Sequence, residues 1–234
     1  MKLTKKDMEA IKKEDSNYIL EKGSKFYMDK DYENAVSYYH LAGSMGNDQA
    51  LCNLGYYYLD GRCVEVNLDL AIAYFELASH RHNVDACYRL GDIYSSNKWK
   101  VKDNELSIHY YRMAANYLIG EDWKDDFNIA YTDSLTGYPN LCYALAKEMM
   151  PGGHMKTDIE EAYQFLKHAK KGYILEIRNG VDSYDDSYKD VLKRLNNKIF
   201  DDVREEVDGI FDDEGSKGEY TEKNGIWFTY NFKK

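Results

Sequence analysis

Residues 49–82 read QALCNLGYYYLDGRCVEVNLDLAIAYFELASHRH, and their pattern decides the fold. Apolar side chains recur every three or four residues in two runs, which is the periodicity of an amphipathic α-helix. Asp60 and Gly61 interrupt the pattern between the runs, so the stretch predicts two helices joined by a turn. A single helical hairpin cannot bury both of its faces, so this one needs neighbours of the same kind.

The same hairpin recurs along the chain at an interval of 36 residues. Two small residues, seven positions apart, mark the second helix of each copy. They are Ala35 and Ala42, Ala71 and Ala78, Ser107 and Ala114, and Ala162 and Ala169. The fourth pair is displaced by a further 19 residues, which corresponds to an insertion over residues 121–138. We therefore expect four hairpins within residues 16–173.

A second series supports this register, because an aspartate or asparagine stands four residues before the first small residue of each copy. The series is Asp31, Asn67, Asp103 and Asp158. Short side chains with an oxygen acceptor are favoured at helix N-caps, where they accept from free backbone amides. We predict that each of them starts the second helix of its hairpin. In the fourth copy, Thr157 and Glu160 form an alternative capping box that would move the cap by one residue.

Small and large residues also alternate between the two helices. Gly55 and Gly91 follow a leucine at the same place in the first helices of the second and third copies. We expect both glycines where the two helices of a hairpin approach each other closely. The large partners on the second helices are Tyr38, Tyr39, Tyr74, Phe75, Tyr110, Tyr111 and Phe165.

These residues resemble the Sel-one-like repeat, a relative of the tetratricopeptide repeat with a longer turn. The second copy is the most similar, through Leu54-Gly55, Gly61 and Tyr74-Phe75. It departs from the family in having Cys63 where a second glycine is usual, and the first copy has a shorter turn, as in a plain tetratricopeptide unit. The resemblance implies an all-α, right-handed α-solenoid of about four helix-turn-helix repeats, with a concave face lined by first helices. It also implies protein or peptide binding.

Four segments follow from this interpretation. Residues 1–15 are expected to form an N-terminal helix, residues 16–173 the repeats with their insertion, residues 174–214 a C-terminal capping helix, and residues 215–234 a tail. The capping helix is expected to run unbroken over about residues 184–211, since one apolar stripe follows its length. Repeat arrays need such an element with a polar outer face.

Composition narrows the function classes. The formal net charge of −10 argues against a nucleic-acid surface or an anionic membrane surface and is compatible with basic protein partners. No stretch has the pattern of a signal peptide or a membrane span. The four cysteines form no CxxC pair, so we expect reduced thiols in a cytoplasmic protein.

The concave face can be located by its offset from the Leu-Gly motif of each first helix. Positions one residue after the glycine, three before it and six before it are expected to face a bound polypeptide. They are Asn17, Leu20, Ser24, Gln49, Cys52, Tyr56, Asp85, Tyr88, Asp92, Asn140, Tyr143 and Lys147. Amides can bond a peptide backbone, and tyrosines offer rigid contact area. The alternative is that these are merely exposed helix positions.

The tail is the second candidate for an interaction. Its last apolar stretch contains Trp227, Phe228, Tyr230 and Phe232, which would form a sticky patch if left in water. It either folds back on the last helix or docks as an extended segment, in which case the chain is a structural homo-oligomer. The insertion at residues 121–138 is either a functional loop or a partial extra hairpin.

We expect no catalysis, no cofactor and no metal site. His80 and His82 lie two residues apart, so on a helix they point away from each other and serve one ion poorly. The paired carboxylates of the sequence are adjacent residues and therefore diverge. No phosphate-binding glycine loop, nucleophile elbow or zinc spacing occurs. An enzyme whose site is assembled in the groove is the less favoured alternative.

Overall fold

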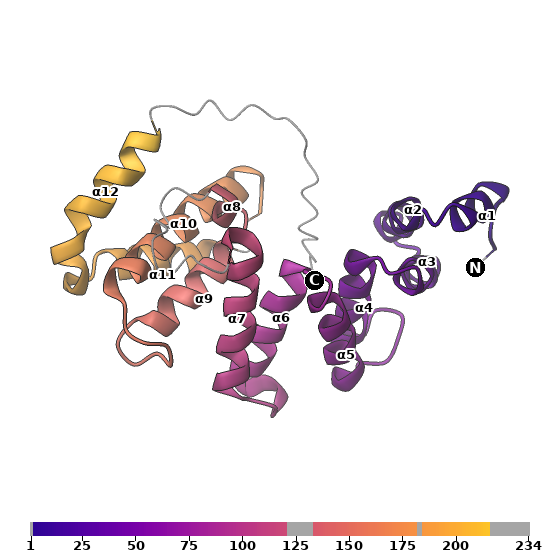
Figure 1. Ribbon diagram of the computed structural model, residues 1–234, viewed down its shortest axis with the longest axis horizontal. Helices are drawn as coiled ribbons and strands as arrows, with labels where there is room; N and C mark the ends of the chain where they lie inside the picture. Colours follow the sequence, from indigo (N-terminus) through magenta and orange to yellow (C-terminus); the bar gives the residue numbers. More distant parts are fainter. Residues whose placement is uncertain (1, 121–132, 182–183, 216–234) are drawn as a thin grey trace. The chain divides into compact units, whose positions relative to one another are not determined.

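The computed structural model describes residues 2–120, 133–181 and 184–215 (Figure 1). These residues form helices joined by short connections, and no β-strand occurs among them. The chain divides into two compact units, Met1–Tyr117 and Leu118–Lys234. The all-α fold of helix-turn-helix repeats expected from the sequence is confirmed, and we describe each unit by itself.

Unit 1 consists of a short N-terminal helix followed by three helical hairpins. The helices are α1 (Lys5–Lys12), α2 (Ser16–Met28), α3 (Tyr32–Ser44), α4 (Asp48–Asp60), α5 (Leu68–Ser79), α6 (Val84–Ser95) and α7 (Asn104–Ile119). The hairpins pair α2 with α3, α4 with α5 and α6 with α7, and a 3-10 helix (Asn97–Trp99) lies in the last turn. Consecutive hairpins pack in sequence order, α3 against α4 and α5 against α6. This order is the arrangement that defines an α-solenoid.

The predicted N-caps of the second helices are all present. The side chains of Asp31, Asn67, Asp103 and Asp158 accept hydrogen bonds from backbone amides three residues later. The alternative start at Thr157 is wrong, because Asp158 is the cap and Glu160 instead accepts from Gln164. A further series caps the first helices. The side chains of Asp15, Asn47 and Asn83 each accept a hydrogen bond from the backbone amide three residues later. Short polar residues therefore cap both helices of all three hairpins of unit 1.

The two helices of each hairpin approach closely at the glycine of the first helix. A Cβ atom on Gly91 would lie 2.5 Å from the ring of Tyr111, and one on Gly55 would lie 2.6 Å from the ring of Phe75. In the fourth copy, Ala146 stands in place of the glycine and Leu166 in place of the aromatic residue. The residue on the first helix is therefore larger and its partner on the second helix is smaller. The predicted close approach is therefore confirmed in unit 1.

Replacing Gly91 with alanine should destabilise unit 1. The added methyl group overlaps a tyrosine ring that is itself buried, so helix or ring must shift, and overpacking of this kind costs about 1–3 kcal/mol. Gly209 on α12 is the matched control, because an added Cβ there meets nothing within 4 Å. Gly209→Ala should raise the free energy of unfolding by about 0.5–1 kcal/mol through helix propensity. Urea denaturation of both variants, followed by circular dichroism, tests the contrast; equal effects would contradict it.

A stacked pair of aromatic rings closes each hairpin of unit 1. The centroid separations are 5.3 Å for Phe26 and Tyr38, 5.5 Å for Tyr58 and Tyr74, and 5.8 Å for Tyr94 and Tyr110. The rings of each pair are nearly parallel, which is the offset arrangement that aromatic side chains favour. The tyrosines thus supply much of the bulk between paired helices.

Two buried tyrosines of the first core differ in the fate of the hydroxyl. Tyr38 and Tyr57 are each 1% exposed. The Tyr38 hydroxyl donates to the Asp7 carboxylate at 2.9 Å. The Tyr57 hydroxyl has no hydrogen-bond partner in the part of the chain that the structure describes. Tyr57→Phe should therefore raise the free energy of unfolding by about 1 kcal/mol, because an unpaired buried hydroxyl is removed. Tyr38→Phe should lower it by about 1–2 kcal/mol. Thermal unfolding of the two variants must move in opposite directions.

Unit 2 holds the fourth hairpin and the elements that follow it. They are α8 (Asp133–Thr136), α9 (Pro139–Met149), α10 (Ile159–Arg178), α11 (Asp185–Leu195), a 3-10 helix (Lys198–Phe200) and α12 (Asp201–Gly215). Helix α10 packs against α9, α11 and α12. The Nζ atom of Lys167 on α10 lies 2.7 Å from Asp208 of α12, and the ring of Phe200 is fully buried.

The expected unbroken helix over residues 184–211 is wrong. The chain turns at Asn196 and Asn197, and the Asn197 side chain accepts from the amide of Ile199 at 3.0 Å, which starts a new helical segment. Asparagine competes for backbone amides in this way, so one apolar stripe can continue across a break. The C-terminal element is therefore a pair of helices.

Candidate interaction surface

The first helices of the second and third hairpins present one polar surface, which we call the α4–α6 face. It consists of Gln49 and Tyr56 on α4 and of Asp85, Tyr88, Arg89 and Asp92 on α6. Residues seven apart lie two turns along the same side of a helix, and residues three or four apart are neighbours on it. All six side chains are partly exposed. Five of them are positions that the sequence pattern predicts.

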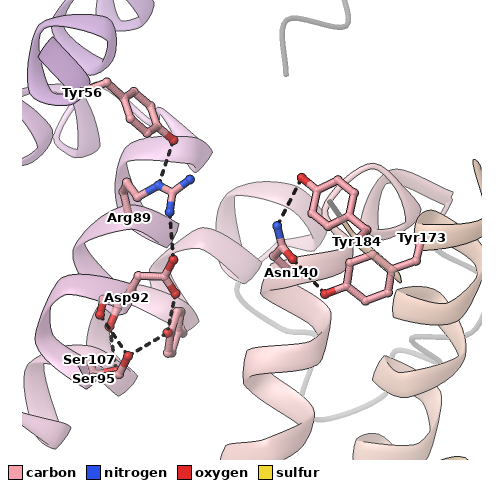
Figure 2. A network of polar contacts seen from close by, with 10 residues as sticks. Tyr56, Arg89, Asp92, Ser95, Ser107, Asn140, Tyr173 and Tyr184 are labelled. Atoms are coloured by element: carbon pink, nitrogen blue, oxygen red, sulfur yellow. Dashed lines mark hydrogen bonds and ion pairs between the residues drawn. The ribbon is translucent and has the colours of Figure 1, made fainter. Parts of the chain in front are cut away.

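Arg89 joins the two helices of this face (Figure 2). Its Nε atom donates to the hydroxyl of Tyr56 at 2.9 Å, and its Nη1 atom donates to the Asp92 carboxylate at 3.1 Å. The guanidinium lies 5.1 Å from the centroid of the Tyr56 ring and 5.3 Å from that of the Tyr88 ring. A guanidinium held by an anion and two aromatic rings is fixed in orientation.

The Asp92 carboxylate links the face to the next helix (Figure 2). Its second oxygen accepts from the hydroxyl of Tyr111 on α7 at 2.9 Å, and that hydroxyl also lies 3.3 Å from the Ser95 hydroxyl. Both oxygens of Asp92 are therefore engaged by residues of unit 1. Its position is fixed from two sides, which makes it a rigid part of the surface.

Asp85 differs from Asp92 in its partners. It lies one turn before Arg89 on α6, and its carboxylate makes no hydrogen bond or ion pair among the described residues. Burial raises the pKa of Asp85 to about 6, and the nearby charge of Arg89 offsets only part of that effect. Asp85 is the one carboxylate of the α4–α6 face that its surroundings leave poorly stabilised.

An amide network holds the start of α6 against the start of α4. The side-chain nitrogen of Asn83 donates to Asp48 at 2.8 Å and to Gln49 at 3.3 Å. The Gln49 amide nitrogen in turn donates to the side-chain oxygen of Asn53 at 3.1 Å. Both polar atoms of the Gln49 side chain are therefore hydrogen-bonded within the protein. This differs from the expectation that its amide bonds a peptide.

The remaining predicted positions of unit 1 differ in burial. The prediction that Cys52 contacts a bound polypeptide is wrong, because its side chain is fully buried in a core with Ala86 and Leu90. Leu20 packs against the core of the first hairpins, and Asn17 is exposed and accepts from the side-chain amide of Asn47 at 3.0 Å. A small offset along a helix separates a core position from a surface one, which explains these differences. Ser24 is partly buried on α2.

The predicted positions of the fourth hairpin are used for packing within unit 2. Asn140 accepts from the hydroxyl of Tyr173 at 2.8 Å and donates to that of Tyr184 at 3.5 Å (Figure 2). The Tyr143 hydroxyl bonds Asp190 and accepts from Arg194, both on α11. Lys147 is exposed, with its ammonium 4.6 Å from the centroid of the Tyr143 ring. These first-helix positions therefore hold the terminal helices.

Sequence reasoning missed Arg89, the residue at the centre of the face. It lies two residues before Gly91, an offset that the pattern assigns to neither the core nor the surface. A signal was present, because Arg89 lies three residues before Asp92, a spacing that allows bonding along one helix face.

Other predictions concern residues outside this face. Within the expected insertion at residues 121–138, residues 121–132 lie outside the described residues, and Asp133–Thr136 form α8. The tail residues Trp227, Phe228, Tyr230 and Phe232 also lie outside the described residues. His80 and His82 are both exposed, and the His82 ring packs 4.6 Å from that of Tyr117. No group of three potential ligands for a metal ion is found within residues 2–120, 133–181 and 184–215. No helix in these same ranges has the length and apolarity needed to span a membrane.

The stacked hairpins and their first-helix face define a helical-repeat protein. The model of the Sel1 repeat matches residues 16–47, 48–83, 84–116 and 139–171, which together exceed half of the chain. The chain belongs to the Sel1 repeat family, whose members generally serve as scaffolds for protein interactions.

The solved structures that are similar to the chain include the following two. The crystal structure of a Sel1 repeat protein from Oxalobacter formigenes shares 19% identity, with a TM-score of 0.47, over 75% of this chain and 49% of that one. The crystal structure of c5321, described as a protective antigen of uropathogenic Escherichia coli with an SLR fold, shares 13% identity, with a TM-score of 0.46, over 92% and 59%. The chain thus spans 49% of the first relative's length and 59% of the second's. No curated protein matches the sequence.

Proposed function

We propose that this protein binds another polypeptide through the α4–α6 face, as a non-catalytic adaptor, inhibitor or assembly subunit. The observation that carries the proposal is the pre-organised set of Tyr56, Tyr88 and Arg89, which two helices hold by direct bonds while the side chains stay partly exposed. Tyrosine and arginine dominate binding energy at interfaces between proteins. Side chains already fixed before binding lose little entropy on association.

The proposed surface is smaller than the one expected from the sequence, which extends across all four copies. Asn140 and Tyr143 of the fourth hairpin already bond α10 and α11, so the proposed surface rests on the second and third hairpins. A cytoplasmic location and the absence of enzymatic activity belong to the same proposal. Self-association through the tail is an alternative outcome of the experiment below.

Site-specific photo-crosslinking tests the surface directly. Tyr88 is replaced by the photoreactive p-benzoylphenylalanine, which preserves an aromatic ring at this position, and the full chain is exposed to a library of random extended peptides. Leu77 on α5, which is 52% exposed, receives the same group as a matched control. We expect peptides to crosslink at position 88 and not at position 77.

Each other outcome has a distinct meaning. Equal crosslinking at both positions would show nonspecific adhesion and contradict the proposed face. Crosslinks only between copies of the chain would favour the structural oligomer. Peptides that bind the chain but avoid position 88 would place the binding surface elsewhere.

A further inference from the structure

The α4–α6 face carries more negative than positive charge. The face itself carries two carboxylates, Asp85 and Asp92, and one cation, Arg89, whose Nη1 atom bonds Asp92. Asp48, the first residue of α4, adds a third carboxylate next to the face. The formal net charge of the whole chain, −10, has the same sign as this local excess. A ligand that adds a positive charge here gains electrostatic energy, and an anionic ligand loses it.

The three carboxylates differ in what they can still accept. Asp48 accepts from the Asn83 side chain at 2.8 Å, and Asp92 accepts from both Arg89 and Tyr111. Asp85 accepts no hydrogen bond among the described residues, so both of its oxygens remain available to a ligand. A carboxylate with two vacant oxygens is matched by the two parallel donors of a guanidinium.

We propose that the α4–α6 face recognises an arginine side chain of its polypeptide partner, with the guanidinium bidentate to Asp85. This inference rests on the proposed function and adds the chemistry of the partner. Tyr88 is partly exposed one turn along the same helix from Asp85, and its ring packs against Arg89 and Tyr111. It therefore lies beside the proposed arginine site and reports on it, while Asp85 supplies the hydrogen-bond acceptors.

The protonation of Asp85 gives this recognition a pH dependence. The charged group that acts on Asp85 is Arg89 on its own helix, and the titratable groups of α4 that feel the charge of Asp85 are Cys52 and Tyr56. Burial raises the pKa values of Cys52 and Tyr56, so both are neutral near pH 7 and add no charge. Burial also raises the pKa of Asp85 to about 6, so its carboxylate is protonated below that pH. Arginine recognition should therefore strengthen as pH rises through about 6.

Two short probes isolate the charge. One is an acetylated, amidated pentapeptide with a central arginine between tyrosine and glycine residues, and the other carries citrulline, an uncharged analogue of the same shape, in its place. Amide chemical-shift changes on the full chain report both affinity and location. We expect the arginine probe to bind about tenfold more tightly than the citrulline probe, with shifts over residues 85–92.

The variant Asp85→Asn should remove this preference and leave the fold intact, because no internal bond of Asp85 is lost. Asp29→Asn, at an exposed aspartate after α2, is the matched control and should retain the preference. If the two probes bind equally, or if Asp85→Asn still prefers arginine, the inference is overturned. In that event crosslinking of library peptides at position 88 still supports the proposed function, whereas its absence there counts against the function itself.

Discussion

Replacing Leu54 with alanine should lower the free energy of unfolding by about 2–5 kcal/mol. The Leu54 side chain is 1% exposed and lies in the core that joins the first two hairpins, together with Ile19 and Tyr57. Truncation removes buried apolar surface and leaves a cavity that rigid helices can fill only in part. The loss should be visible as a shift of the urea midpoint with an unchanged slope.

Leu77→Ala supplies the matched control, because it is the same substitution in the same unit at a side chain that is 52% exposed. Its effect should stay within about 0.5 kcal/mol. Lys147→Ala in unit 2 should also be close to neutral, since Lys147 is exposed. If Leu54→Ala and Leu77→Ala cost the same, the assignment of buried and exposed helix faces is wrong.

Replacing Asp7 with asparagine should cost about 2–4 kcal/mol, toward the lower end of what breaking a buried ion pair costs. The Asp7 carboxylate is fully buried and accepts from Lys22 at 2.6 Å, from Tyr38 at 2.9 Å and from the amide of Thr4 at 2.6 Å. Lys22 is 21% exposed and can turn toward water, which reduces the penalty. Hydrogen exchange should show α1 and α2 losing protection before the rest of unit 1.

The same carboxylate predicts an acid limit on stability. Burial alone would raise the pKa of Asp7, but the hydrogen bonds from Lys22, Thr4 and Tyr38 outweigh it and hold the pKa well below the ordinary value of 3.8. A lowered folded-state pKa contributes stability that is complete above the unfolded value and is lost as pH falls below it. The wild type should lose stability more steeply than Asp7→Asn below about pH 4. Parallel pH profiles of the two proteins would contradict this assignment.

The repeat register could be predicted from sequence because it is written in local chemistry. A cap such as Asp31 or Asn67 acts on amides three residues away, and a glycine such as Gly91 is required by one facing ring. Each constraint recurs at a fixed interval, so an ambiguous position in one copy can be assigned from the equivalent positions in the others. The four hairpins and their order followed from this redundancy.

The details of the surface could not be predicted in the same way. The exposure of Cys52 depends on α6 covering it, and the use of Tyr143 depends on α11, which belongs to no recognisable copy of the repeat. The break at Asn197 is decided by one side-chain bond within a continuous apolar stripe. The role of Arg89 could not be predicted because it depends on the packing of α6 against α4, which brings Arg89 next to the Tyr56 hydroxyl.

The matched caps at Asn47 and Asn83 have a consequence for engineering. Each starts a first helix and also donates to the preceding hairpin, Asn47 to Asn17 and Asn83 to Asp48. A duplicated module of residues 48–83 inserted after Asn83 would therefore meet the same junction chemistry at both seams. After the fourth hairpin, the surface that a further repeat would contact is already bonded to α11 through Tyr143. The array can therefore be lengthened in its interior, whereas α11 blocks an addition after Arg178.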